Sequence, residues 1–396
     1  MTKWQEKSLG EIAEVTKLAG FEFTKYIKYI DNGEIIALRA LNLRNGELDL
    51  SDIKRISREV SEDLTRSKIY KDDILLTYTG NGYGDCAIIE ENDKYHLAPN
   101  ICKIVPNQNI VYPYYLYCYI SSKAFYNQMS NNMTGSGQPT IPMKTIRQLK
   151  IPVPDIRVQV KLANMMWAIN QKIRYNKQIN NNLEQQARLI FNNFFFQADK
   201  DRSCWKETSL LNIADYLNGL AMQKYRPQNN EPSLPVLKIK ELRQGICDNS
   251  SDLCSSHISS EYIIHNGDVI FSWSGTLLVD FWTGGECGLN QHLFKVTSTK
   301  YEKWFYYLWT KHHLDNFIDI AANKATTMGH IKRSDLQSSI VLVPPVEEYN
   351  HISSIITPLF NEAISRRIEN NELSKLRNIL LTKLLSNDTN NLDSTL

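Results

Sequence analysis

The residues of this chain that are capable of chemistry form no recognised catalytic motif. The seven cysteines stand singly without C-x-x-C spacing, which favours reduced thiols over a disulfide framework or a zinc site. The sequence also lacks a G-x-x-x-x-G-K-[ST] phosphate loop and a G-x-S-x-G nucleophile elbow. We therefore expect no catalytic residue, no metal and no cofactor in this chain. The histidines, none of which has metal-site spacing, are His96, His257, His265, His292, His312, His313, His330 and His351.

One glycine-rich segment, Gly80-Asn81-Gly82-Tyr83-Gly84, follows a predicted strand as a nucleotide-binding loop does. A Rossmann-type loop, however, opens a helix whose N-terminus holds the phosphate. Here the next residues, Asp85 to Glu90, are predicted to form another strand. We therefore interpret the segment as a flexible hairpin loop, which can approach a partner closely.

The composition is that of a soluble globular protein with two or three domains. The chain has 396 residues, of which 42% are hydrophobic and 22% charged. No apolar run reaches the roughly 18 residues of a membrane span, and the N-terminus lacks a signal-peptide core, so we expect a cytoplasmic protein. The net charge of +2 is weak for a nucleic-acid binder. A DNA partner would require a local positive surface or help from other subunits.

The elements that carry these residues occur twice. The segment from Trp4 to Glu14 matches Trp205 to Asp215 with six of eleven positions identical, at an offset of 201. Further along, Asp73 to Gly80 matches Asp268 to Gly275 at an offset of 195, and the offset falls to 190 near the end of each copy. Small loop deletions produce such a steady fall, so we infer an internal duplication.

Each copy combines a strand-rich part with a long helix, which predicts the α+β fold class. Short β-branched and aromatic runs, such as Ile74 to Tyr78 and Val269 to Trp273, alternate with Gly, Asn and Asp turns. A shorter helix is expected after the third strand of each copy. The predicted boundaries are 1–154 and 201–345 for the strand-rich domains, 155–200 and 346–386 for the long helices, and 387–396 for a flexible tail.

The long helices are predicted from apolar residues spaced three and four apart. A helix of about 40 residues is roughly 60 Å long, and an exposed apolar stripe of that length requires a partner helix. We predict an antiparallel, coiled-coil-like pair with pseudo-twofold symmetry; in the alternative, each helix packs only on its own domain. Pro358 should kink or break the second helix near Ile356. The stripes contain Ile169, Ile173, Leu183, Ala187, Ile190 and Phe194, and then Phe360, Ile364, Ile368, Leu373, Leu376, Leu380 and Leu384.

This arrangement resembles the specificity subunits of type I restriction-modification systems, over essentially the whole chain. The marks of the resemblance are Trp-x-Glu-x-x-Leu-x-x-Ile-Ala at each domain start, Leu-Lys-Ile-Pro-Val-Pro before the first helix, and the tandem itself. Gln159 resembles the glutamine with which the helix of this family opens, and the second copy has no glutamine at 347–350.

The resemblance implies that each strand-rich domain is a target recognition domain that reads one half of a split, asymmetric DNA sequence. The paired helices would fix the gap between the halves and dock two modification subunits, which bind S-adenosylmethionine and recruit restriction subunits. The specificity subunit itself would not catalyse a reaction.

The resemblance also makes the matched polar loops candidates for DNA contact, because base edges and phosphates are read by polar and basic side chains. Asn100 and His292 align with each other just before a strand. The candidates are Thr77, Tyr78, Thr79, Asn81, Tyr83, Asn100, Gln138, Thr140 and Lys144 in the first copy, and Ser272, Trp273, Ser274, Thr276, His292, Thr326, Thr327, His330 and Lys332 in the second.

Three other interpretations remain open from the sequence. The first is a free-standing DNA-binding protein without modification partners. The second is a coiled-coil adaptor with two protein-binding domains, and the third is a fused enzyme with an unrecognised catalytic centre. An apolar stripe left uncovered by helix pairing would count against the free-standing protein.

Overall fold

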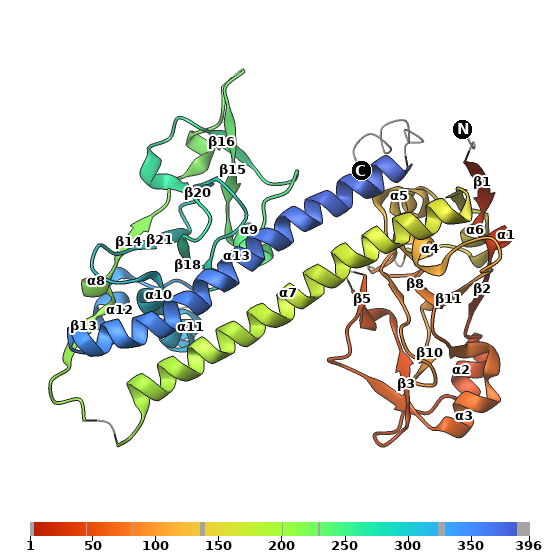
Figure 1. Cartoon of the computed structure of the whole chain (residues 1–396), viewed down its shortest axis with the longest axis horizontal. Coiled ribbons are helices and arrows are strands. Elements are labelled where there is room, and N and C mark those ends of the chain that lie inside the picture. Colours follow the sequence, from red (N-terminus) through yellow and green to blue (C-terminus); the bar gives the residue numbers. More distant parts are fainter. Residues whose placement is uncertain are drawn as a thin grey trace. The chain divides into compact units, whose positions relative to one another are not determined.

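The computed structural model describes residues 4–44, 46–80, 82–134, 139–199, 201–228, 230–323 and 329–385. The chain forms two compact units (Figure 1): unit 1 comprises residues 1–171 and 376–396, and unit 2 comprises residues 172–375. Each unit holds one strand-rich domain and a stretch of both long helices, α7 (Ile156–Phe196) and α13 (Val346–Leu385). The predicted α+β class and tandem organisation are confirmed.

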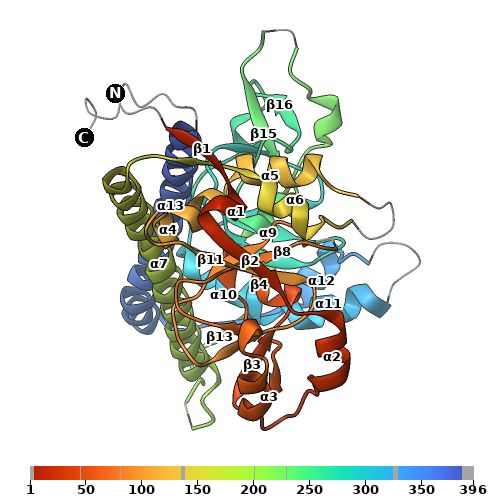
Figure 2. The same ribbon diagram turned by 90° about the vertical axis from the view of Figure 1, so that its right-hand side faces the viewer.

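The described part of unit 1 contains two four-stranded sheets (Figure 2). One has the order β2-β11-β8-β9, formed by Ala13–Lys17, Ile101–Pro106, Ile74–Thr77 and Cys86–Ile88. The other has the order β6-β3-β10-β7, formed by Lys54–Ile56, Ile35–Leu38, Tyr95–Leu97 and Lys68–Ile69. Two antiparallel pairs complete it, β1 (Gln5–Ser8) with β12 (Lys150–Val153) and β4 (Leu43–Arg44) with β5 (Glu47–Leu48). Its shorter helices are α1 (Leu9–Ile12), α2 (Gly20–Tyr26), η1 (Ala40–Asn42), α3 (Arg58–Asp63), η2 (Thr65–Ser67), α4 (Pro113–Ile120), α5 (Lys123–Asn131) and α6 (Met143–Gln148).

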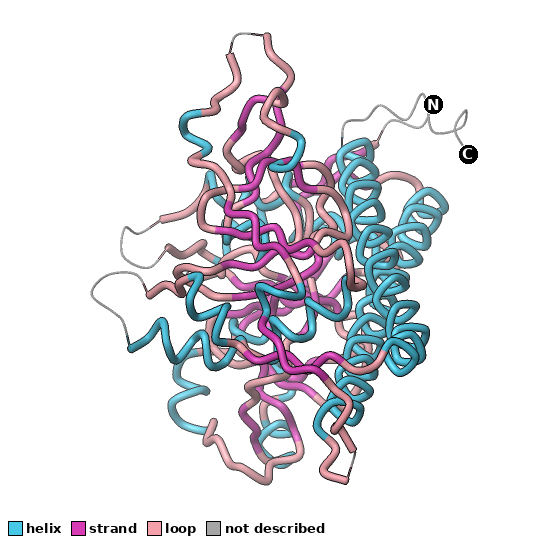
Figure 3. Tube along the Cα trace, turned by 90° about the vertical axis from the view of Figure 1, so that its left-hand side faces the viewer, coloured by secondary structure: helices cyan, strands magenta, loops and turns pink. Residues whose placement is uncertain are grey.

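Unit 2 repeats the two four-stranded sheets of this plan within its described residues. Strands are magenta and helices cyan in Figure 3. The sheet β14-β21-β18-β19 is formed by Asp215–Asn218, Leu293–Thr297, Val269–Ser272 and Leu278–Phe281. The sheet β16-β15-β20-β17 is formed by Leu253–Ser255, Ser233–Leu237, Cys287–Leu289 and Ile263–Ile264, and β13 (Lys206–Ser209) pairs with β22 (Ile340–Val343). Its shorter helices are α8 (Leu210–Ile213), η3 (Met222–Lys224), α9 (Ile239–Gln244), η4 (Ser260–Tyr262), α10 (Lys303–His312), α11 (Leu314–Asn323) and α12 (Arg333–Ser338).

The duplication extends to individual contacts. In unit 1 the buried Lys103 Nζ donates a hydrogen bond to the Lys68 carbonyl at 2.6 Å. In unit 2 the matching Lys295 Nζ donates to the Ile263 carbonyl at 3.0 Å. Each lysine thereby ties an inner strand of one sheet, β11 or β21, to an edge strand of the other sheet, β7 or β17. Because such a bond satisfies an ammonium group that has left water, it stabilises the sheet junction in both units.

A strongly apolar helix forms the core of unit 2. In α10 every residue from Trp304 to Thr310 is buried. The Tyr307 ring lies 4.4 Å from Phe281 of β19, and the Trp309 ring lies 5.2 Å from Phe195 of α7. A helical segment whose side chains are all buried must be covered on all sides, and Trp304–Thr310 of α10 is covered by the sheet and by the long helix.

Each single helix expected after the third strand is in fact two helices. In unit 1, α4 ends at Ile120, and the Ser122 side chain caps α5 by accepting a hydrogen bond from the Phe125 N–H at 3.3 Å. Serine at an N-cap satisfies a helix donor that has no partner in the helix itself. The apolar periodicity continues across this break, which explains why the sequence pattern predicts one helix.

The predicted antiparallel pairing of the long helices is confirmed within unit 2. Ala187, Phe191 and Phe195 of α7 belong to the same buried cluster as Phe360 and Ile356 of α13. The alternative, in which each helix packs only on its own domain, is wrong. Pro358 was expected to kink or break the second helix, and a break is excluded because α13 is continuous through this residue. Pro358 is exposed, so its ring points away from the buried face that holds the helix.

The centre of the helix pair in unit 2 is polar, which the apolar stripes did not predict. Asn176 is completely buried. Its amide nitrogen donates to Glu369 Oε2 at 2.7 Å and to Asn370 Oδ1 at 2.9 Å, and its oxygen accepts from Arg366 Nη1 at 2.9 Å. A buried asparagine between two helices fixes their register at some cost in stability.

The predicted stripe residues differ in how deeply they are buried. Ile173 and Ala187 are buried, and Leu376 is 46% exposed. The side chain of Leu384 lies outside the described residues. The partly buried members are Ile169, Leu183, Ile190, Phe194, Ile364, Ile368, Leu373 and Leu380.

Candidate nucleic-acid interface

The same junction of three segments occurs in both units, at the loop that follows the central strand. In unit 1 the Tyr78 N–H donates to the Asn100 carbonyl at 3.3 Å, and the Ile141 N–H donates to the Tyr78 carbonyl at 3.0 Å. In unit 2 the Trp273 N–H donates to the His292 carbonyl at 3.4 Å, and the Ile331 N–H to the Trp273 carbonyl at 3.1 Å. The loop, the turn before β11 or β21 and the segment before α6 or α12 therefore meet at equivalent positions.

The loop itself makes the same backbone turn in both units. Gly80 has φ 81° and Gly275 has φ 65°, in the left-handed region that favours glycine. Each glycine N–H donates to the segment before the short helix, to the Pro139 carbonyl at 2.9 Å and to the Gly329 carbonyl at 3.2 Å. The backbone of the junction is thus common to the two units, and the side chains are left to differ.

In unit 1 the junction is lined by hydroxyl groups and one aromatic ring. The hydroxyl oxygens of Thr79 and Thr140 lie 2.7 Å apart in a hydrogen bond. Lys17 Nζ lies 5.3 Å from the centre of the Tyr78 ring, a cation–π arrangement. Burial raises the pKa of the Tyr78 hydroxyl, so this group stays protonated as a donor. Asn100 is exposed at a left-handed φ of 74°.

In unit 2 the same positions carry imidazole and indole rings. Ser274 Oγ lies 3.0 Å from His292 Nδ1, and Ser274 forms a β-bridge with His330. The Trp273 ring lies 6.1 Å from the His292 ring and 6.3 Å from the His330 ring. Its indole N–H donates to Asn218 Oδ1 at 2.9 Å. Four of the predicted contact residues of unit 2 therefore form one cluster.

The base of the unit 1 loop is fixed by a pair of tyrosines. Tyr83 and Tyr126 of α5 stack with ring centres 5.2 Å apart, and the Tyr126 hydroxyl donates to the Tyr83 oxygen at 2.8 Å. This bond lowers the pKa of the Tyr83 hydroxyl. Position 84 requires glycine beside this pair, because a Cβ there would lie only 2.7 Å from the Tyr126 ring. Tyr126 is not among the residues predicted from the sequence, because only the fold brings it to the loop.

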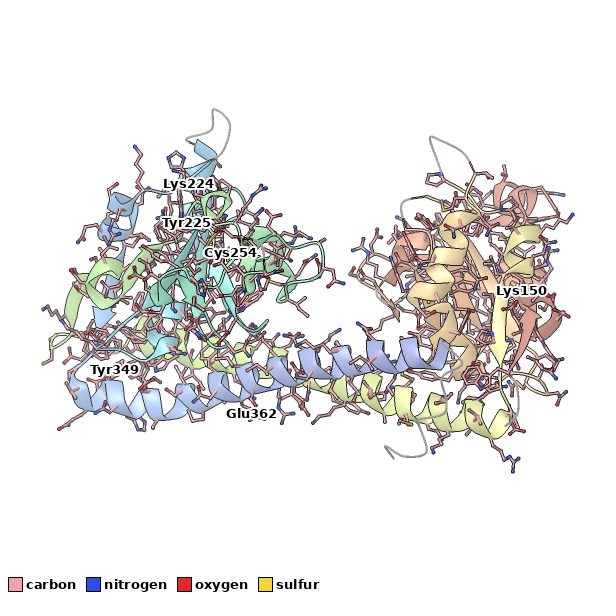
Figure 4. All side chains as sticks on the ribbon, turned by 90° about the horizontal axis from the view of Figure 1, so that it is seen from above. Lys150, Lys224, Tyr225, Cys254, Tyr349 and Glu362 are labelled. Carbon is pink, nitrogen blue, oxygen red and sulfur yellow. The ribbon has the colours of Figure 1, made fainter. Side chains whose placement is uncertain are left out.

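A basic cleft of about 820 Å³ lies beside the junction in unit 2, and His292 belongs to both. Figure 4 labels Lys224, Tyr225 and Cys254 in this region, where the Tyr225 carbonyl accepts from the Ser255 N–H at 2.8 Å. Lys238 lines the cleft and forms an ion pair with Asp252. The cleft residues absent from the sequence-based candidates include Gln223, Arg226, Lys238, Lys240 and Gln291.

Unit 1 contains a similar ion pair. Arg39 Nη2 lies 2.9 Å from Asp52 Oδ1, and Arg39 matches Lys238 at an offset of 199. The basic residues Arg39 and Lys238 therefore occupy matching positions of the two copies, which is a signal for this surface that the sequence contains.

Comparison with known proteins decides the family. A family model described as "Type I restriction modification DNA specificity domain" matches residues 1–185 and 203–375. The chain belongs to this family. With two copies of the domain it is a DNA-recognition subunit of the type I restriction-modification class, and the resemblance seen in the sequence is confirmed.

Individual members of the family are similar to this chain over nearly its whole length. The type I restriction enzyme MjaIX specificity subunit of Methanocaldococcus jannaschii is 24% identical, over 96% of this chain and 92% of its own. The EcoKI specificity subunit of Escherichia coli is 22% identical, over 95% and 86%. The crystal structure of a type I S subunit from M. genitalium has the same fold, with a TM-score of 0.61 at 12% identity over 96% of both chains.

Burial revises several of the predicted DNA contacts of this specificity subunit. Thr77 and Ser272 are completely buried, and Thr79 and Ser274 are only 8% and 5% exposed. Thr77 and Ser272 end the central strands, and Thr79 and Ser274 lie two residues further along. The hydroxyls of Thr79, Ser272 and Ser274 hydrogen-bond inside the junction, whereas the Thr77 hydroxyl is buried without a hydrogen-bond partner. Burial leaves the four residues little surface for DNA, so we interpret them as positioning the loop.

The other predicted contacts have accessible surface or are not among the residues that the structure describes. Asn81, Gln138, Thr326 and Thr327 are outside the described residues. The exposed or partly exposed candidates are Tyr78, Tyr83, Asn100, Thr140, Lys144, Trp273, Thr276, His292, His330 and Lys332. These residues stay predictions as DNA contacts.

The described residues contain no group of three or more His, Cys, Asp or Glu side chains arranged to hold a metal ion. In the same part of the chain, no helix is both long and apolar enough to cross a membrane.

Proposed function

We propose that this specificity subunit reads a split, asymmetric DNA target, with the unit 1 junction on one half and the unit 2 junction on the other. The observation that supports this is that the junctions of the two units have the same backbone and different side chains. These are Tyr78 and Asn100 in unit 1, and Trp273 and His292 in unit 2. Because the backbone conformations match, both loops are presented in the same way, while their different side chains recognise different bases.

The proposal includes the partners of the complex. The helix pair fixes the gap between the two half-sites and docks two modification subunits, through which restriction subunits join. S-adenosylmethionine and the methyl-transfer residues belong to the modification subunits, and this chain supplies no catalytic group. We place the complex in the cytoplasm.

Exposed apolar side chains on the helices support a docking role. Trp167 is 51% exposed on α7, and Ile379 is 53% exposed on α13; both belong to unit 1. Large exposed apolar side chains mark protein interfaces, and tryptophan is prominent among the residues that dominate binding energy. The helices therefore carry apolar surface that their mutual packing does not cover.

The test of DNA recognition uses the full chain assembled with the modification subunits of its own system. The complex methylates a random DNA library with S-adenosylmethionine, and the modified sites are sequenced. We expect one adenine-methylated motif with two unlike halves and a constant gap. Replacing residues 1–154 by another recognition domain should change one half only. A continuous motif, or a change in both halves, contradicts the proposal.

Docking is tested separately. Trp167→Ala should weaken binding of the modification subunit by about tenfold or more, because truncation of a central interface aromatic costs roughly 2 kcal/mol or more. Phe21→Ala removes a comparably exposed ring outside the long helices, at 68% exposure, and serves as the matched control. Equal affinities of the two variants, measured by calorimetric titration, would remove Trp167 from the interface.

A further inference from the structure

We propose that Gln291 is the base-reading residue of the unit 2 cleft and that it recognises an adenine in the second half-site. This inference rests on the proposed function, since it presumes that unit 2 binds DNA. Gln291 lines the basic cleft next to His292, at the point where the cleft meets the loop junction.

A chain of hydrogen bonds holds the Gln291 amide in one orientation. Gln291 Nε2 lies 3.3 Å from His292 Nε2, and His292 Nδ1 lies 3.0 Å from Ser274 Oγ. The amide nitrogen is a donor, so His292 Nε2 is the acceptor and Nδ1 carries the ring proton. The Nδ1–H group then donates to Ser274 Oγ. Ser274 is only 5% exposed and its carbonyl accepts from Ser272 Oγ at 3.2 Å, so the chain is anchored in the core.

The groups that remain on the amide match adenine. An amide nitrogen carries two N–H groups, and the contact with His292 uses one. The other N–H and the Oε1 oxygen remain, which are the donor and acceptor that read adenine N7 and the N6 amino group in the major groove. A glutamine fixed in this way loses less side-chain entropy on binding than a free surface glutamine does.

The surroundings of Gln291 suit a nucleic-acid backbone. Arg226, Lys238 and Lys240 line the same cleft, against one lining carboxylate, Asp252. Lys240 Nζ donates to Ser250 Oγ at 2.7 Å and lies 3.9 Å from Glu241 Oε1 and 4.0 Å from Asp248 Oδ2. Cations around a glutamine provide phosphate contacts that position the duplex while the amide reads a base edge.

Unit 1 has no amide at this position. Asn100 corresponds to His292, so the residue before it, Pro99, corresponds to Gln291. Proline has no side-chain donor or acceptor, so this reading group belongs to unit 2 alone. A change at Gln291 must therefore act on one half of the target.

The experiment compares complexes assembled with the wild-type chain and with Gln291→Ala, Gln291→Glu and Gln244→Ala. Gln244 is an exposed glutamine at the end of α9 that does not line the cleft, and its variant is the matched control. Methylated sites from a random library give the preference at every position. In Gln291→Ala we expect preference at one A·T pair of the second half to fall about tenfold or more, with the first half and the gap unchanged. Gln291→Glu should shift that position towards C·G, because a carboxylate accepts from cytosine N4.

Each result decides the inference. An unchanged motif in Gln291→Ala overturns it while leaving the proposed function intact. Relaxation at a pair other than A·T, or equally at all positions of the second half, also overturns it. A wild-type complex that yields no split motif overturns the proposed function, and this inference with it. The retained first half shows that each variant has folded and assembled.

Discussion

The recognition loops of unit 1 and unit 2 share a backbone and differ in chemistry. Thr79 pairs with Thr140 in one, and Ser274 contacts His292 and His330 in the other. The backbone bonds from Tyr78 and Trp273 are the same within a few tenths of an ångström. The duplicated part is therefore the main-chain junction, because main-chain bonds hold the loop whichever side chains it presents. Specificity can then change without loss of the fold.

The two units also differ in how the long helices are held. Unit 2 contains the buried Asn176 network, whereas in unit 1 Arg377 Nη1 donates to Asn170 Oδ1 at 3.4 Å and Leu380 packs against the core. Asn176 is inaccessible, and Asn170 is partly exposed. We infer that register is set in unit 2, where the hydrogen bonds of a completely buried asparagine depend on the alignment of the two helices.

The largest expected effect comes from a substitution that removes this difference between the two units. Asn176→Ala leaves Arg366 and Glu369 without their buried partner, and we expect a loss of about 2–3 kcal/mol, as for hydrogen bonds to charged groups. Asn170→Ala is the control and should cost roughly 1 kcal/mol or less. Hydrogen exchange of α13 peptides within residues 346–375 measures the effect. Equal protection in the two variants would show that the polar centre does not hold the helices.

The next effect tests the shared backbone. Gly80→Val and Gly275→Val each place a β-branched residue at a positive φ, which costs on the order of 1–3 kcal/mol. Each variant should impair recognition of its own half-site and leave the other intact, as measured by methylation of targets mutated in one half. Gly20→Val, where a Cβ meets nothing within 4 Å and no positive φ is required, is the control. If either loop variant impaired both halves, the units would not be independent.

A third prediction concerns a histidine found in unit 1 only. His96 is completely buried, and burial lowers its pKa; the matching position of unit 2 is Gly288. The folded-state pKa lies below the unfolded value of about 6.5, so this contribution to stability is present above that pH. It is lost as the pH falls from there towards the folded-state pKa.

The loss at His96 amounts to at most about 1.4 kcal/mol per pH unit for one proton. Equilibrium unfolding from pH 7.5 to 5 should therefore be less steep for His96→Gln than for the wild type. Parallel profiles would show that His96 does not titrate on unfolding.

The smallest expected effect concerns the exposed lysines beside the two junctions. Lys144→Ala and Lys332→Ala should each weaken DNA binding by the assembled complex and reduce the salt slope by about one. The double variant should lower the slope by about two, since the sites lie in different units. Fluorescence anisotropy at several salt concentrations gives the slopes. If both slopes stay at the wild-type value, these segments make no phosphate contact.

Much of this molecule was predictable from the order of its residues. The repeat from Trp4 and from Trp205, the strand runs and the long helices follow from local patterns, because each depends on neighbours in sequence or on a copied segment. The match of Asn100 with His292, and of Gly80 with Gly275, was also visible in the alignment of the copies. Their geometry confirms that the duplication preserves backbone positions.

What only the tertiary structure decided concerns contacts between segments far apart in the chain. Thr77 and Ser272 look like polar loop residues and are buried, because the surrounding segments cover them. Asn176 looks like part of a polar helix face and is the centre of the helix pair. Gln291 gains a role only when the fold brings His292 to Ser274. Periodicity reports which face of an element is apolar, but burial, register and the orientation of an amide depend on partners that local sequence does not specify.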